Sequence, residues 1–83
     1  MGWFAESRRK SADGELAEGW SRIGGPYKSQ ERAKAECKAV FLAEPQNATR
    51  IEFRTVADDE RGTVYQECKP PHGTRLRWTN AAW

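Results

Sequence analysis

The chain is short of the residues from which metal sites are usually built. Its 83 residues include only two cysteines, Cys37 and Cys68, and one histidine, His72. Three such residues cannot complete a four-ligand zinc site. The acidic run at residues 58–60 lacks the glycine-bearing spacing of a calcium loop, so we interpret it as a solvated hairpin. We therefore expect no metal, no cofactor, and two reduced, buried thiols that act as small apolar side chains.

Long apolar runs and catalytic motifs are absent too. No segment approaches the roughly 18 apolar residues of a membrane span, and no apolar run follows a basic start as it does in a signal peptide. We therefore expect a cytoplasmic protein that binds no membrane, in the host cytoplasm if a phage encodes it. Gly24-Gly25 lacks the third glycine of a dinucleotide loop. No serine or cysteine has the sequence context of a nucleophile, and His72 is interpreted as a turn residue. These absences predict a protein that is not an enzyme and takes no small-molecule substrate.

Aromatic residues are what the chain has instead. Four tryptophans, three phenylalanines and two tyrosines offset a hydrophobic share of only 37%. Each buried aromatic side chain removes roughly 150–250 Å² of surface from water. A chain of 83 residues corresponds to one domain, so we expect a single domain over residues 1–83, with residues 80–83 as a loose tail.

One amphipathic helix is predicted over residues 29–44. Ser29 can cap its N-terminus, and Pro45 disfavours helical geometry in the residue before it and so ends the helix. Leu42 lies either at the margin of the core or on a contact surface, and the margin is our expectation. One apolar stripe follows the spacing i, i+4, i+7 and i+8, through Ala33, Cys37, Val40 and Phe41.

Five strands are predicted around this helix. They cover residues 3–8, 20–23, 50–56, 63–68 and 74–79. Hairpins on either side of one helix are typical of a mostly antiparallel sheet with the helix across one face. The expected fold class is therefore α+β, with a single mostly antiparallel sheet of four or five strands, one helix packed on one face, and the order ββαβββ.

Alternation predicts which side chains of the later strands face the helix. In the third strand, Ile51 and Phe53 face it. In the fourth strand, either Val64 and Cys68 point inward or Tyr65 does. We prefer Val64 and Cys68 inward, with Tyr65 on the open face. In the fifth strand the apolar side chains share one face and the arginines the other.

The open face of the sheet carries most of the candidate binding residues. Arginine outnumbers lysine nine to five, and its planar fork suits phosphates and carboxylates. Such a face could grip a nucleic-acid backbone, meet an acidic protein surface, or simply show water a polar side. Two lysines on one helix edge form a second candidate. The predicted binding residues are Arg22, Arg50, Arg54, Tyr65, Arg75, Arg77, Lys34 and Lys38.

The order of elements resembles that of small phage and mobile-element proteins. Two early strands, the helix start Ser29-Gln30-Glu31-Arg32-Ala33-Lys34, then Arg50-Ile51-Glu52 and two closing strands look like small anti-CRISPR proteins acting on type I systems. Gly19-Trp20 before an alanine-rich helix is also similar to a widespread bacterial domain of unknown function. The likeness covers most of residues 20–78 as a pattern. The first resemblance implies a stoichiometric blocker that binds the crRNA-guided surveillance complex and obstructs target DNA.

The sequence thus leads to three hypotheses. The first is a non-enzymatic binding protein, an inhibitor whose partner is a host protein complex such as the crRNA-guided effector. The alternative is a small DNA- or RNA-binding domain that uses the arginine-bearing sheet face. The third is a homodimer that hides this face, so the chain is expected to be a monomer or a homodimer.

Overall fold

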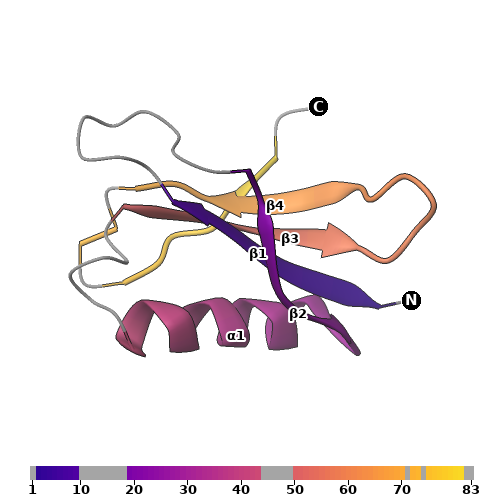
Figure 1. Cartoon of the computed structure of the whole chain (residues 1–83), viewed down its shortest axis with the longest axis horizontal. Coiled ribbons are helices and arrows are strands. Elements are labelled where there is room, and N and C mark those ends of the chain that lie inside the picture. Colours follow the sequence, from indigo (N-terminus) through magenta and orange to yellow (C-terminus); the bar gives the residue numbers. More distant parts are fainter. Residues whose placement is uncertain (1, 10–18, 44–49, 71, 74, 82–83) are drawn as a thin grey trace.

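In the computed structural model of the protein, one helix packs across an antiparallel sheet (Figure 1). The structure describes residues 2–9, 19–43, 50–70, 72–73 and 75–81. The sheet order is β2-β1-β3-β4-β5, and the helix lies between β2 and β3 in the chain. The expected α+β fold and its element order are confirmed. In the part of the chain that the structure describes, no helix has the length and hydropathy of a membrane-spanning segment. The elements are β1 (Trp3–Arg9), β2 (Ser21–Tyr27), α1 (Gln30–Ala43), β3 (Ile51–Ala57), β4 (Val64–Cys68) and β5 (Thr79–Asn80).

Helix α1 begins and packs as its sequence predicts. The Ser29 hydroxyl accepts the backbone N–H of Arg32 at 3.1 Å, so the cap is made. The predicted end at residue 44 lies outside the described residues. Of the apolar stripe, three residues are buried and Val40 is half-buried against the core; the buried ones are Ala33, Cys37 and Phe41.

The core lies between α1 and the three strands β2, β1 and β3. Ala5 of β1 and Phe53 of β3 are fully buried there. The small side chains of Ala33 and Cys37 face them from the helix, so the helix can lie close to the sheet. Strand β3 is buried along nearly its whole length, because β1 and β4 flank it and α1 covers one of its faces.

Strand β2 continues through residues that were expected to end it. It was predicted to stop after Ile23, but it runs to Tyr27. The strand lies at the edge of the sheet, where Pro26 needs no ladder hydrogen bond on its outer side. Its register with β1 shifts beside Gly25, which has a φ of +121°. A Cβ at Gly25 would lie 2.8 Å from the Trp3 carbonyl oxygen, so glycine is required at this close approach.

A bulge in β4 reverses part of the predicted facing. Val64 pairs with Val56, and Gln66 pairs with Thr55, the residue just before Val56 in β3. Tyr65 therefore has no partner residue of its own in β3 and forms the bulge. Cys68 points into the core as predicted. The preference for Val64 inward and Tyr65 outward is wrong: Val64 shares the side of Val56, away from the helix, and the Tyr65 ring meets the Trp3 ring at 5.0 Å between centroids.

The chain after β4 differs most from the prediction. Only Thr79–Asn80 forms a strand with β4, so the predicted strand over 74–79 is wrong for residues 75–78. Asn80 pairs with Gln66, and the Ala81 N–H donates to the Tyr65 carbonyl at 3.0 Å. The expected loose tail therefore does not begin at residue 80, and residues 82–83 lie outside the described part.

Candidate functional site

Paired charges occupy the sheet face opposite α1. The Glu6 carboxylate accepts hydrogen bonds from Arg54, at 2.7 Å, and from Arg22, at 3.1 Å. The Glu52 carboxylate lies 3.0 Å from an Arg8 nitrogen. Both carboxylates are buried, at 7% exposure for Glu6 and 4% for Glu52. A buried carboxylate needs such partners, so these arginines neutralise acids of the same chain.

The same guanidinium groups also lie over aromatic rings. The Arg22 guanidinium is 3.6 Å from the Phe4 ring centroid. Arg8 and Arg54 lie 4.6 Å and 4.1 Å from the Trp20 ring. Cation–π contacts of this kind hold the cation in place. Each of the three arginines thus has a carboxylate and a ring as partners within the molecule.

Alternation along β1 could have revealed this network. Phe4, Glu6 and Arg8 occur two residues apart and therefore share one face of the strand. Of this network, only Arg22 and Arg54 are among the predicted binding residues, because alternation was not applied to the charges of β1. Of the other predicted residues, Arg50 is exposed just before β3 and Tyr65 lies on the helix side; Arg75 and Arg77 follow β4 outside any strand.

His72 is buried rather than exposed in a turn, which corrects the sequence interpretation. Its exposure is 6%, and its ring lies against Phe41 and Phe53 at centroid distances of 5.7 Å and 5.9 Å. The Nε2 atom contacts the Ile51 carbonyl oxygen. Because a carbonyl only accepts, Nε2 is the donor in this contact, and Nδ1 faces the Cys68 sulfur at 3.7 Å.

Both thiols are free and buried, as the sequence predicted. Burial raises the pKa of Cys37 to about 12, with a smaller contribution from nearby Cys68. Burial also raises the pKa of Cys68, although the backbone N–H of Arg77 donates to its sulfur and opposes this rise. Neutral thiols without access to solvent are poor nucleophiles. Among the described residues, no group of three or more metal-ligating side chains could hold a metal ion.

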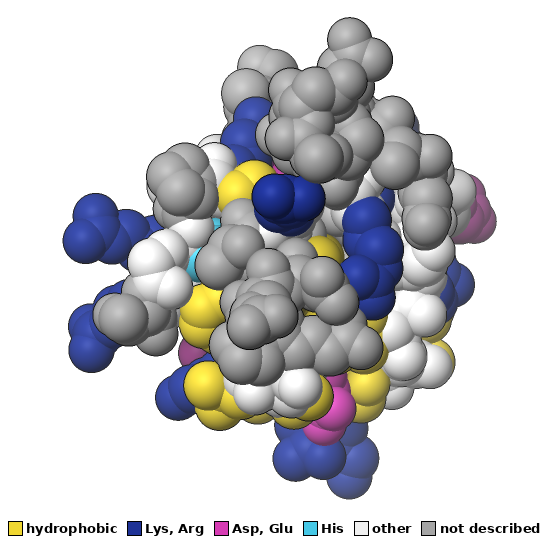
Figure 2. Space-filling view, turned by 60° about the vertical axis from the view of Figure 1, so that its left-hand side comes forward, with side chains coloured by type: hydrophobic (Ala, Val, Ile, Leu, Met, Phe, Trp, Pro, Cys, Tyr) yellow, Lys and Arg dark blue, Asp and Glu magenta, His cyan; other side chains and the backbone are white. Residues whose placement is uncertain are grey.

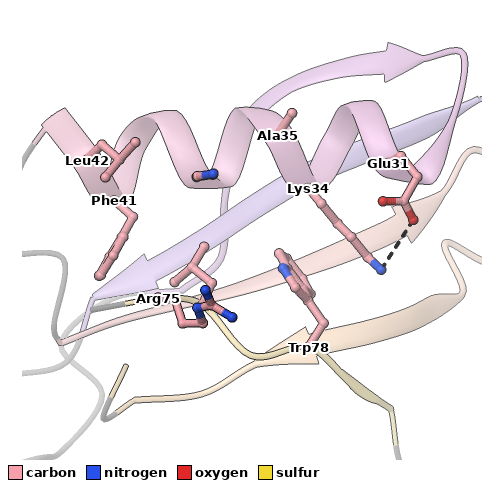
Figure 3. A pocket seen from close by; sticks show the side chains of 9 residues that line it. Glu31, Lys34, Ala35, Phe41, Leu42, Arg75 and Trp78 are labelled. Atoms are coloured by element: carbon pink, nitrogen blue, oxygen red, sulfur yellow. Dashed lines mark ion pairs between the residues drawn. The ribbon is translucent and has the colours of Figure 1, made fainter. Parts of the chain in front are cut away.

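The Arg75 N–H donates to the His72 carbonyl at 3.4 Å, and the Arg77 N–H donates to the Cys68 sulfur. The segment of residues 75–78 is thus attached to the core, and it runs along α1 (Figure 3). A groove of about 650 Å³ lies between this segment and the helix, hereafter the α1 groove (Figure 3). Phe41, Leu76 and Trp78 contribute its apolar lining. Leu42 also lines it and is 62% exposed, so the expectation that this residue lies at the margin of the core is wrong.

Three cations line the α1 groove: Lys34, Lys38 and Arg75. The Lys34 ammonium lies 3.6 Å from the Glu31 carboxylate and 5.6 Å from the Trp78 ring centroid (Figure 3). Lys38 and Arg75 form no ion pair with any residue that the structure describes. The sequence predicted the two lysines on one edge of the helix and Arg75 on the open face of the sheet. In the structure all three line the same groove.

No protein-family model, curated protein or solved structure matches the chain. The inhibitor and the nucleic-acid-binding hypotheses are therefore distinguished by the geometry of the open sheet face and of the α1 groove. In the view of Figure 2, lysine and arginine side chains are spread among hydrophobic and uncharged ones and form no single continuous patch. The α1 groove combines an apolar lining, an exposed leucine and two cations without an ion-pair partner in the described part of the chain, which makes it the better candidate site.

Proposed function

We propose that this protein is a non-enzymatic binding protein, an inhibitor that uses the α1 groove to bind a type I CRISPR surveillance complex and block target DNA. The observation that supports this choice is exposed Leu42 beside Lys38 and Arg75, which have no ion-pair partner among the described residues. The resemblance of the element order supports the choice of target. A cytoplasmic setting, where such complexes act, belongs to the same proposal.

A small protein can block a larger one by covering part of its surface. A standard protein interface takes roughly 800 Å² from each partner, about a seventh of the 5547 Å² that this protein exposes. The longest dimension of the molecule is 36 Å. A few well-packed side chains at the centre of an interface supply most of the affinity, and charges at its rim mainly set the association rate and the choice of partner.

The alternative, a DNA- or RNA-binding domain, has less support in the geometry. Phosphate binding needs cations that are free to meet the backbone. On the open sheet face, Arg8, Arg22 and Arg54 are paired with Glu6 and Glu52, which leaves a nearly neutral surface. A gel shift at low salt tests this alternative, and retention of duplex or single strand that weakens steeply with salt would revive it.

A titration of purified type I effectors of several subtypes with this protein tests the proposed function. We expect target-DNA binding by at least one effector to be lost near one equivalent of inhibitor. Leu42→Asp should need a large excess, because it places a charge in the apolar part of the groove. Ala39→Asp is the matched control, since it adds the same charge at an exposed position of α1 outside the groove. Undiminished DNA binding across the subtypes would refute the proposal.

A further inference from the structure

We propose that the α1 groove binds an acidic, amphipathic segment of a partner protein, with its apolar side chains along the groove and its carboxylates against the rim. This inference rests on the proposed function, because it names the chemistry of the partner at the same site. Its evidence is the apolar lining, the charge of the rim and the length of the groove.

The apolar lining calls for apolar side chains in the occupant. Leu42 is the only large hydrophobic side chain that is exposed in the described part of the chain, at 62%. It continues the surface formed by Leu76 and Trp78, which are half-buried against the core. A single exposed leucine is ordinary, but one that extends a hollow apolar surface offers area that a ligand can remove from water.

The rim calls for carboxylates. Lys38 and Arg75 have no ion-pair partner among the described residues. The acid paired with Lys34 is Glu31, whose side chain is 85% exposed, so this carboxylate is open to solvent and can be exchanged for another one. Three cations and one acid leave the groove with an excess of positive charge. An acidic segment complements this charge, and a basic segment would be repelled.

The dimensions and the aromatic ring favour a protein segment over a nucleic acid. The lining runs along α1 from Glu31 to Leu42, which is about 16 Å, or three helical turns. That length suits an amphipathic segment with anchors at i, i+3 or i+4 and i+7. Binding of single strands relies on aromatic faces open for stacking, and Lys34 lies over the Trp78 ring.

Selection from a random display library of peptides of about twelve residues, the length of the groove, tests the inference with the full chain as bait. We expect enriched peptides to combine Asp or Glu with large apolar residues. Synthetic copies of these peptides should bind the Lys38→Glu, Arg75→Glu double variant at least about tenfold more weakly. The Lys28→Glu, Arg61→Glu double variant is the matched control: it changes the net charge equally, at exposed positions outside the groove, and should bind as the parent does. Circular dichroism confirms that both variants fold.

Several outcomes would overturn the inference. These are enrichment of neutral or basic peptides, no enrichment at all, equal weakening by both double variants, or an oligonucleotide that displaces the selected peptides from the groove. The proposed function can fail separately. Groove-dependent acidic peptides without effector inhibition would refute only the CRISPR target. Inhibition that the Lys38→Glu, Arg75→Glu variant retains in full would refute only the acidic segment.

Discussion

At the scale of single residues, Thr55 places an unsatisfied hydroxyl group in the core. Its side chain is fully buried, and its Oγ1 has no hydrogen-bond partner among the described residues. A buried hydroxyl without a partner loses its hydration and gains nothing in return. It lies in β3 next to the bulge that admits Tyr65.

Thr55→Val should therefore stabilise the protein. Valine keeps the shape of threonine and removes the unsatisfied hydroxyl, so we expect the free energy of unfolding to rise by about 1 kcal/mol. Urea denaturation measures the change. The control is Thr63→Val, which should not stabilise, because the Thr63 hydroxyl bonds to Asp59. Lower stability of Thr55→Val would mean that the hydroxyl has a partner.

The buried thiols make stability depend on pH in the alkaline range. Burial raises the pKa of Cys37 from 9.0 to about 12 and raises that of Cys68 as well. Between pH 9.0 and about 12, the unfolded chain releases the Cys37 proton and the folded chain keeps it, so the free energy of unfolding falls as pH rises. This contribution is fully present below about pH 9 and is lost toward pH 12.

We expect the free energy of unfolding to decline from about pH 9 upward. Denaturant titrations between pH 7 and pH 10.5, roughly the span of thiol ionisation, measure it. Cys37→Ala should show a shallower decline, because alanine has no proton to release. Its absolute stability will be lower through the lost packing, so the slopes are compared. Equal slopes for the two proteins would show that the Cys37 thiol does not contribute.

At the scale of elements, the segment of residues 75–78 depends on His72. Its ring fills space between Phe41 and Phe53 and donates to the Ile51 carbonyl. The segment forms no strand there, and the wall of the α1 groove is built from it.

His72→Ala should loosen this wall. The lost packing and hydrogen bond should lower the free energy of unfolding by about 2–3 kcal/mol. Amide hydrogen exchange should show faster exchange at residues 75–78. His72→Gln, which keeps an N–H donor, should lose less protection. Unchanged exchange at residues 75–78 in His72→Ala would show that the segment is held by other contacts.

For residues 75–78, periodicity predicts which side chains share a side but not which element they pack against. Leu76 and Trp78 do share one side, as their spacing predicts. The spacing cannot tell which element that side meets, because alternation is a local property. In the structure His72 is buried and residues 75–78 lie beside α1, so Arg75 lines the groove instead of the open sheet face.

At the scale of the whole molecule, Glu6 joins three strands. It lies in the central part of β1 and pairs with Arg22 of β2 and Arg54 of β3. These strands are adjacent in the sheet, although the two arginines are far apart in the chain. A single carboxylate therefore connects the edge of the sheet with its centre.

Glu6→Gln should lower stability. It removes the charge that both arginines share, and since Arg22 is about half exposed we expect a loss of only about 1–2 kcal/mol. Thermal denaturation at low salt measures the effect. Glu60→Gln is the control, because it makes the same charge change at an exposed position of the β3–β4 hairpin. Equal melting temperatures for the two variants would show that the Glu6 network adds nothing.

The paired charges also bear on assembly. Since Arg22, Arg54 and Arg8 already have partners, a second copy that covered the open face would remove these ion pairs from water, which costs free energy. We expect light scattering to show a monomer of about 9.5 kDa. A mass twice as large would support the homodimer hypothesis instead.

The sequence by itself determined the helix with its Ser29 cap, its seam through Cys37 and Phe41, and the order of elements, because caps and periodicity act over a few residues. Only the tertiary structure decided that His72 is buried and that Lys38 and Arg75 line one groove. Those contacts join residues far apart in the chain, and local patterns of caps and periodicity do not specify them.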